Sequence, residues 1–131
     1  TYEAMMRGIN VIRPGAPTGD IGAAIQNFVE AQHMSVVRDF CGHGLGKLFH
    51  DEPNIVHVGR PGEGIVLRPG MFFTVEPMIN LGRPHVKVLS DGWTAASRSS
   101  RHRPRASTSR PTRPPRRHNF RDCQPALHPS S

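Results

Sequence analysis

Residues 41–53 read CGHGLGKLFHDEP, in which His43 lies between two glycines and His50 follows seven residues later. The glycines predict irregular backbone over residues 41–46, because glycine tolerates conformations that other residues avoid. Glycine also lets the backbone approach a ligand closely, and a histidine between two glycines is not in a typical core-packing position. Residues 41–53 are therefore the candidate functional segment of the chain.

Two helices and a strand are predicted before this segment. The first helix covers residues 2–12 and is ended by the proline- and glycine-rich residues 13–17. The second runs from Thr18, its expected N-cap, to about Gln32, because its apolar residues recur at helical spacing. A strand rich in β-branched residues is predicted over 35–40.

Short strands and turns are predicted after the segment. We expect strands at the following residues: 54–58, 71–76, 79–80 and 85–89. Turns with proline and glycine separate them, at 60–62 and 68–70. Helices first and antiparallel strands afterwards favour the α+β class.

Composition divides the chain at Trp93. Residues 1–93 carry a net charge of −1 and residues 94–131 a net charge of +8, which together make the +7 of the whole chain. The second part is rich in Arg, Pro and Ser, with Phe120 and Leu127 as its large apolar residues. Such a segment buries too little apolar surface to offset its ordering entropy, so we predict a disordered tail over 94–131.

Several classes of protein are disfavoured by composition. The only two cysteines, Cys41 and Cys123, are too few for a disulfide framework or a thiolate zinc site. A reducing, cytoplasmic location is therefore expected. No apolar run approaches the length of a membrane span, so we expect no membrane insertion.

The candidate metal ligands are His43 and Glu76. A neutral imidazole and a carboxylate together suit Zn, Mn, Fe or Co. Glu76 ends an apolar run, where a carboxylate is either solvated at a strand end or paired with a cation. The alternative for both residues is an exposed surface position. His50 remains open between an acid, a hydrogen-bond donor to substrate and a structural histidine.

Two other functional motifs, a phosphate-binding loop and a Cys-His nucleophile pair, are disfavoured by the sequence. Gly42, Gly44 and Gly46 precede Lys47 as in a phosphate-binding loop, but Leu48 stands where Ser or Thr is needed. Cys41 beside His43 could be imagined as a nucleophile and its base. Neighbouring residues of a glycine-rich loop seldom point at each other, so a small, half-buried cysteine is favoured.

The sequence of residues 41–53 closely resembles that of the type I methionine aminopeptidases. The resemblance continues through 68–78 and 91–93, and backward through 20–25 and 8–9. The related Xaa-Pro dipeptidases share the GHG loop and a Glu-Pro strand, but they match CGHGLG and FHDEP less well. Residues 1–93 are accordingly predicted to be part of a catalytic domain.

The resemblance implies a partial pita-bread fold of the creatinase/aminopeptidase type. It implies two divalent ions (Co, Mn, Fe or Zn) and removal of the first methionine of nascent proteins. His43 and Glu76 resemble two of the five metal ligands of the family, and His50 resembles the catalytic histidine that contacts the scissile peptide. Phe49 and Trp93 resemble walls of the methionine pocket. It further implies a cytoplasmic monomer whose substrate is the nascent N-terminus, with the ribosome as a candidate partner.

The chain also departs from the family pattern. Two aspartate ligands and another histidine lie, in the family, before the point where this chain begins. The region of the fifth ligand, a glutamate, corresponds here to residues 100–111, which contain no acidic residue. We therefore expect this chain alone to be inactive. A frameshift near Ala95 is our explanation of the tail, and its alternative is a non-catalytic remnant whose basic tail binds nucleic acid or acidic partners nonspecifically.

Overall fold

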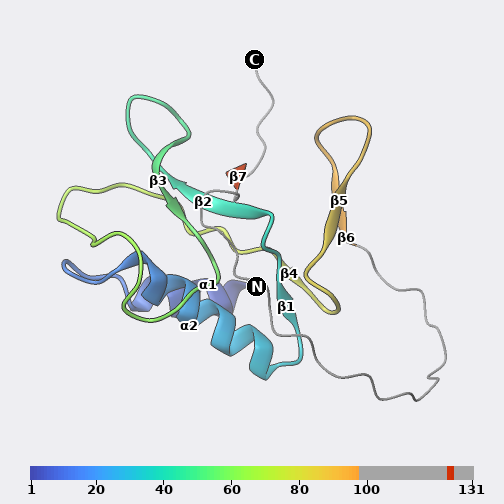
Figure 1. The fold of residues 1–131 in the computed structure, drawn as a ribbon, viewed down its shortest axis with the longest axis horizontal. Helices are drawn as coiled ribbons and strands as arrows, with labels where there is room; N and C mark the ends of the chain where they lie inside the picture. The colour runs from blue at the N-terminus through green and yellow to red at the C-terminus, as the bar shows by residue number, and fades with distance from the viewer. Residues whose placement is uncertain (98–123, 126–131) are drawn as a thin grey trace.

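The computed structural model of the chain describes residues 1–97 and 124–125. Two helices come first and short strands follow (Figure 1), in the α+β order that was predicted. The elements are α1 (Tyr2–Asn10), α2 (Thr18–Ala31), β1 (Ser35–Val36), β2 (Phe40–Gly44), β3 (Asp51–Ile55), β4 (Ile79–Asn80), β5 (Val86–Val88), β6 (Ala95–Ser97) and β7 (Gln124–Pro125). Both helices lie close to their predicted positions.

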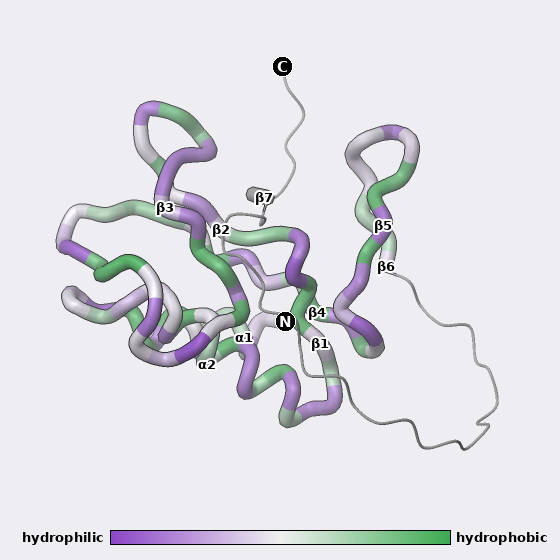
Figure 2. Tube along the Cα trace, in the orientation of Figure 1, coloured by the Kyte–Doolittle hydropathy of each residue, from purple (hydrophilic) through white to green (hydrophobic). Residues whose placement is uncertain are grey.

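The two helices pack directly against each other. Gly8 allows this close approach, because a Cβ there would lie 2.7 Å from Cδ1 of Ile25. The guanidinium of Arg7 also lies over the ring of Phe28, 4.4 Å from its centroid. In Figure 2 the trace of α2 alternates between hydrophobic and hydrophilic stretches, as a helix with one buried face should.

The hydrophobic core lies under α2. Ile21, Ile25 and Val29 point from the helix into the core and are fully buried. The same cluster contains Ile55 at the end of β3 and Leu67 from the following loop, together with Ala4 of α1 and Val36 of β1. The core therefore joins α2 to the strand that follows the candidate functional segment.

Residues 59–67 wrap around the first turn of α2. The main-chain N–H groups of Thr18 and Gly19 donate to the carbonyl oxygens of Ile65 and Glu63, at 2.9 and 2.8 Å. Thr18 was predicted to be the N-cap, and this prediction is wrong. The N-cap is Pro17, and Thr18 is the first residue of the helix. The Thr18 hydroxyl instead accepts a 3.1 Å hydrogen bond from the N–H of Ile65.

Irregular backbone was predicted over residues 41–46, and this prediction is wrong over 41–44, which belong to β2, while residues 45 and 46 lie outside any strand. β2 pairs antiparallel with β3, in a register that places Gly42 opposite Ile55 and shifts before Gly44. The glycines are required by close packing rather than by irregular backbone. A Cβ on Gly42 would overlap the carbonyl oxygen of Thr74.

Other strands are shorter than predicted or shifted. The strand expected over 35–40 is confined to β1, and the one expected over 54–58 appears earlier as β3. Residues 71–76 form no regular strand, although Phe73 bridges to Gly44 and the segment runs along β2. The N–H of Thr74 donates to the carbonyl oxygen of His43 at 2.8 Å, which fixes that segment beside the candidate site.

Two strands lie within the predicted tail. β6 pairs antiparallel with β5, and β7 pairs parallel with β2, where Gln124 lies opposite Phe40. The rest of the tail, residues 98–123 and 126–131, lies outside the described residues, and its disorder stays a prediction. In the described part of the chain no helix is long and apolar enough to cross a membrane.

Candidate metal centre

His43 is held in β2 with its ring almost fully buried, at 2% exposure. Its Nδ1 lies 2.9 Å from the carbonyl oxygen of Gly44. Because a carbonyl oxygen can only accept, Nδ1 carries the proton of the neutral ring and donates it. Nε2 therefore keeps its lone pair, which is the arrangement found in metal-binding histidines.

Glu76 meets His43 on the Nε2 side of the ring. Oε1 of Glu76 lies 3.5 Å from Nε2 of His43, and the Glu76 side chain is 33% exposed. Thr74 connects the two residues, because its hydroxyl accepts from the His43 N–H at 3.0 Å and donates to Glu76 Oε1 at 2.7 Å. Two predicted ligands from separate segments are thus brought together.

The chemistry of this pair fits a divalent metal. A lone pair on Nε2 and a carboxylate oxygen face each other, and both are acceptors, so a cation or a proton between them is favourable. Imidazole nitrogen with carboxylate oxygen is a donor set for Zn, Mn, Fe or Co. Within residues 1–97 and 124–125, no group of three or more His, Cys, Asp or Glu side chains is arranged to hold a metal.

His50 and Phe49 lie against the His43 ring. The ring centroids of His43 and His50 are 4.3 Å apart, and those of His43 and Phe49 are 5.4 Å apart. Phe49 and His50 also meet edge to face. Three of the predicted site residues therefore form one aromatic cluster, although residues 45–50 are not part of a helix or strand.

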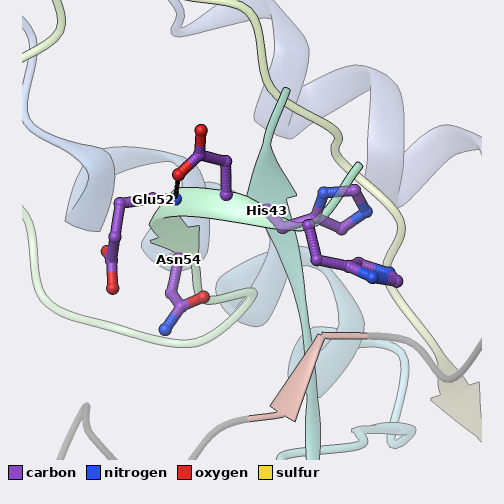
Figure 3. Close-up of a pocket in the computed structure, with 5 residues that line it drawn as sticks. His43, Glu52 and Asn54 are labelled. Atoms are coloured by element: carbon purple, nitrogen blue, oxygen red, sulfur yellow. Dashed lines mark hydrogen bonds between the residues drawn. The ribbon is translucent and has the colours of Figure 1, made fainter. Parts of the chain in front are cut away.

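An open pocket of about 200 Å³ adjoins this cluster (Figure 3). It is lined by His43, His50, Asp51, Glu52 and Asn54. Figure 3 shows the side chains of Glu52 and Asn54 extending away from His43. These carboxylate and amide groups thus do not converge with the histidine, and Glu76 remains its acidic neighbour.

Trp93 lies elsewhere in the chain, on the connection between β5 and β6. Its main-chain N–H donates to Oδ1 of Asp91 at 3.0 Å, and the residue is 46% exposed. The Thr94 hydroxyl donates a hydrogen bond to the same carboxylate. This bond is the main reason why the pKa of Asp91 is lower than usual. Trp93 is not among the residues that line the pocket beside His43.

Two residues that contact the proposed ligands, His57 and Thr74, were not predicted from the sequence. His57 is 2% exposed, and its Nε2 accepts a 3.0 Å hydrogen bond from the N–H of Glu76. Burial lowers the pKa of His57 to about 4, so the ring is neutral at pH 7. Thr74 was detectable in principle, because residues two apart in an extended segment share a face.

Residues 1–100 match the profile of metallopeptidase family M24. The chain belongs to this family. One relative is the methionine aminopeptidase of Rickettsia prowazekii, 58% identical over 100 residues, which are 75% of this chain and 38% of the relative. Another is the methionine aminopeptidase of Escherichia coli K12, which is 45% identical over 98 residues. The match covers 75% of this chain and 37% of the relative. The M24 chain thus spans about two fifths of the length of the curated relatives it matches.

Solved structures support the same assignment. The M24 chain superposes on the crystal structure of the Rickettsia prowazekii methionine aminopeptidase with a TM-score of 0.73 and 56% identity, covering 75% of this chain and 40% of that one. The crystal structure of the Thermotoga maritima methionine aminopeptidase also gives a TM-score of 0.73, at 42% identity. The superposition covers 76% of this chain and 40% of that one. The predicted α+β, partial pita-bread fold is confirmed.

Membership of a metallopeptidase family implies a divalent metal cofactor. His43 and Glu76 are the described side chains whose geometry fits that role. The comparisons give no support to the alternative of a non-catalytic remnant that binds nucleic acid.

Proposed function

We propose that this chain carries part of the active site of a methionine aminopeptidase, which removes the first methionine from nascent polypeptides. The observation that carries the proposal is the 3.5 Å approach of His43 Nε2 to Glu76 Oε1, with the opposite ring nitrogen already bonded to Gly44. The similarity to enzymes of that name over 100 residues supports the choice of reaction.

The proposed site holds two divalent ions, drawn from Co, Mn, Fe or Zn, with His43 and Glu76 among their ligands. When bound, such ions would supply Lewis-acid chemistry, lowering the pKa of a water molecule and polarising the scissile carbonyl group. His43 presents Nε2 because Gly44 holds its Nδ1 proton, and Glu76 presents an oxygen oriented by the Thr74 hydroxyl. These contacts fix both ligands before any substrate arrives.

His50 is the proposed catalytic residue that contacts the scissile peptide of the substrate. Its ring lies against that of His43 and beside the open pocket, so it is next to the proposed ligands. Phe49 is proposed as one wall of the methionine pocket, and it packs edge to face on His50. Trp93 is proposed as a second wall, on the basis of the sequence resemblance.

The remaining assignments rest on the sequence resemblance and on the change of composition at Trp93. The substrate is the N-terminus of a nascent polypeptide, so we place the protein in the cytoplasm as a monomer that works near the ribosome. Residues 1–93 are proposed as the catalytic part, and 94–131 as a separate tail that results from a frameshift.

The test compares the 131-residue chain with a chimera. In the chimera, the 100 matching residues of this chain replace their counterparts in the Rickettsia prowazekii relative. Each protein is incubated with Co²⁺ or Mn²⁺ and the peptide Met-Ala-Ser, and free methionine is measured. The described part of the chain supplies two proposed ligand side chains, which suit one weakly held ion but not the pair of ions that the reaction needs. We therefore expect methionine release by the chimera and none above an EDTA background by the chain alone.

Variants of the chimera assign the residues. His43→Ala and Glu76→Gln should each lower the rate of methionine release by a factor of 100 or more, because each removes a proposed ligand. His85→Ala, at an exposed histidine, should leave the rate unchanged. A folded chimera that releases no methionine, or one that keeps its rate after His43→Ala, would contradict the proposal.

A further inference from the structure

His57 is a buried histidine that the proposed reaction does not use. It lies two residues beyond Ile55 and shares its buried side, with 2% exposure against 0% for Ile55. A polar ring in such a place is unfavourable unless it is hydrogen-bonded. The hydrogen-bond partner of the His57 ring therefore indicates why a histidine is present at this position.

That partner is the main chain of a proposed metal ligand. Nε2 of His57 lies 3.0 Å from the backbone nitrogen of Glu76 and accepts its proton. The bond joins residues 19 positions apart, so it is a tertiary contact rather than a local turn. As an acceptor, Nε2 must be unprotonated, which places the proton of the neutral ring on Nδ1.

Glu76 is consequently held at both ends. His57 fixes its backbone N–H, and the Thr74 hydroxyl fixes its carboxylate oxygen at 2.7 Å. The same hydroxyl is bonded to the backbone of His43, at 3.0 Å from its nitrogen. The backbone contact and the carboxylate contact thus restrict the direction in which Glu76 extends toward Nε2 of His43.

We propose that His57 is a positioning residue for the proposed metal ligand Glu76, acting through the main-chain hydrogen bond; this inference rests on the proposed function. Hydrogen-bond partners outside the ligand set orient the ligands, and losing one typically weakens metal affinity by 10–100-fold. His57 touches neither metal nor substrate in this scheme.

The test uses the full 131-residue chain and three variants. His57→Phe keeps a ring but removes the acceptor, and His57→Gln keeps an acceptor on a flexible side chain. His85→Phe is the matched control at an exposed histidine. Two quantities are measured by NMR: the affinity for Co²⁺, from paramagnetic broadening of the His43 resonances, and the hydrogen-exchange protection of the Glu76 amide.

We expect His57→Phe to weaken Co²⁺ binding by about tenfold or more and to remove the protection of the Glu76 amide. His57→Gln should restore the affinity to within about threefold of the parent, and His85→Phe should match the parent in both measurements. A residue that only filled the core would give no rescue by Gln, since Gln fills the cavity less well than Phe.

Two failures are distinguishable. Equal Co²⁺ affinity in the parent and His57→Phe, with the Glu76 amide exposed in the variant, would overturn the positioning role alone. A folded parent that shows no Co²⁺ broadening at His43 would overturn the proposed metal site and this inference with it.

Discussion

The hydroxyl of Thr74 links the two proposed ligands, since it accepts from the N–H of His43 and donates to the carboxylate of Glu76. Thr74→Val removes this hydroxyl with little change of shape. We expect Co²⁺ affinity to fall by about tenfold, because Glu76 loses the donor that orients it. Isothermal titration calorimetry measures this affinity. Thr94→Val, which removes a hydroxyl from the Asp91 turn, should leave it unchanged.

Gly42 shows why a small residue is needed beside the site. A Cβ at this position would overlap the main-chain oxygen of Thr74, which cannot move without disturbing the contact to His43. We expect Gly42→Ala to destabilise the fold by about 1–3 kcal/mol, as overpacking does. Gly82→Ala is the control, since nothing lies within 4 Å of a Cβ there. Equal melting temperatures for the two variants would contradict this account.

The residues of the site differ in how visible they are in the sequence. His43 and Glu76 could be named because each stands in an unusual local setting, between glycines or at the end of an apolar run, whereas His50 received its role from the family resemblance. His57 could not be singled out, because its proposed role depends on a contact with Glu76 that no local pattern specifies. The proposed ligands could therefore be named from the sequence, whereas His57 could not.

At the level of elements, helices were predicted better than strands. α1 and α2 follow from the helical spacing of apolar residues, which is a local property. β2 was mistaken for a loop because its glycines suggest irregular backbone, whereas pairing with β3 makes them part of a strand. Strand formation depends on a partner distant in sequence, and that partner is not visible in a short window.

The packing of α2 gives a prediction at this scale. Ile25 is fully buried and lies against Gly8 of α1, so it contributes to both the core and the helix pair. We expect Ile25→Ala to cost about 2–5 kcal/mol of unfolding free energy, because it removes buried methyl groups and leaves a cavity. Ile9→Ala, at a residue that is 36% exposed, should cost much less. Urea denaturation followed by circular dichroism compares the two.

For the whole molecule, His57 predicts how stability depends on pH. Burial holds its pKa at about 4 in the folded chain, against 6.5 for the unfolded chain. The unfolded state therefore binds a proton first as the pH falls, so stability present above pH 6.5 is lost between pH 6.5 and pH 4. The expected loss from this group is about 3 kcal/mol at pH 4.

The measurement is the free energy of unfolding of the parent and of His57→Phe, both at pH 7 and at pH 4. Other titrating groups are common to both proteins, so the difference between their pH dependences isolates His57. The parent should lose more stability than the variant over this interval. Parallel loss in both proteins would show that the His57 ring is not kept neutral by the fold.

The wrapping of residues 59–67 around the start of α2 also has a consequence for the timing of folding during synthesis. The first amides of the helix, at Thr18 and Gly19, donate to carbonyl groups of Ile65 and Glu63. Those groups do not exist until nearly 50 further residues have been added, which takes roughly 2–10 s at usual rates of translation. During that interval the first amides of α2 lack these hydrogen-bond acceptors. The core beneath the helix is also incomplete until Ile55 and Leu67 have been synthesised.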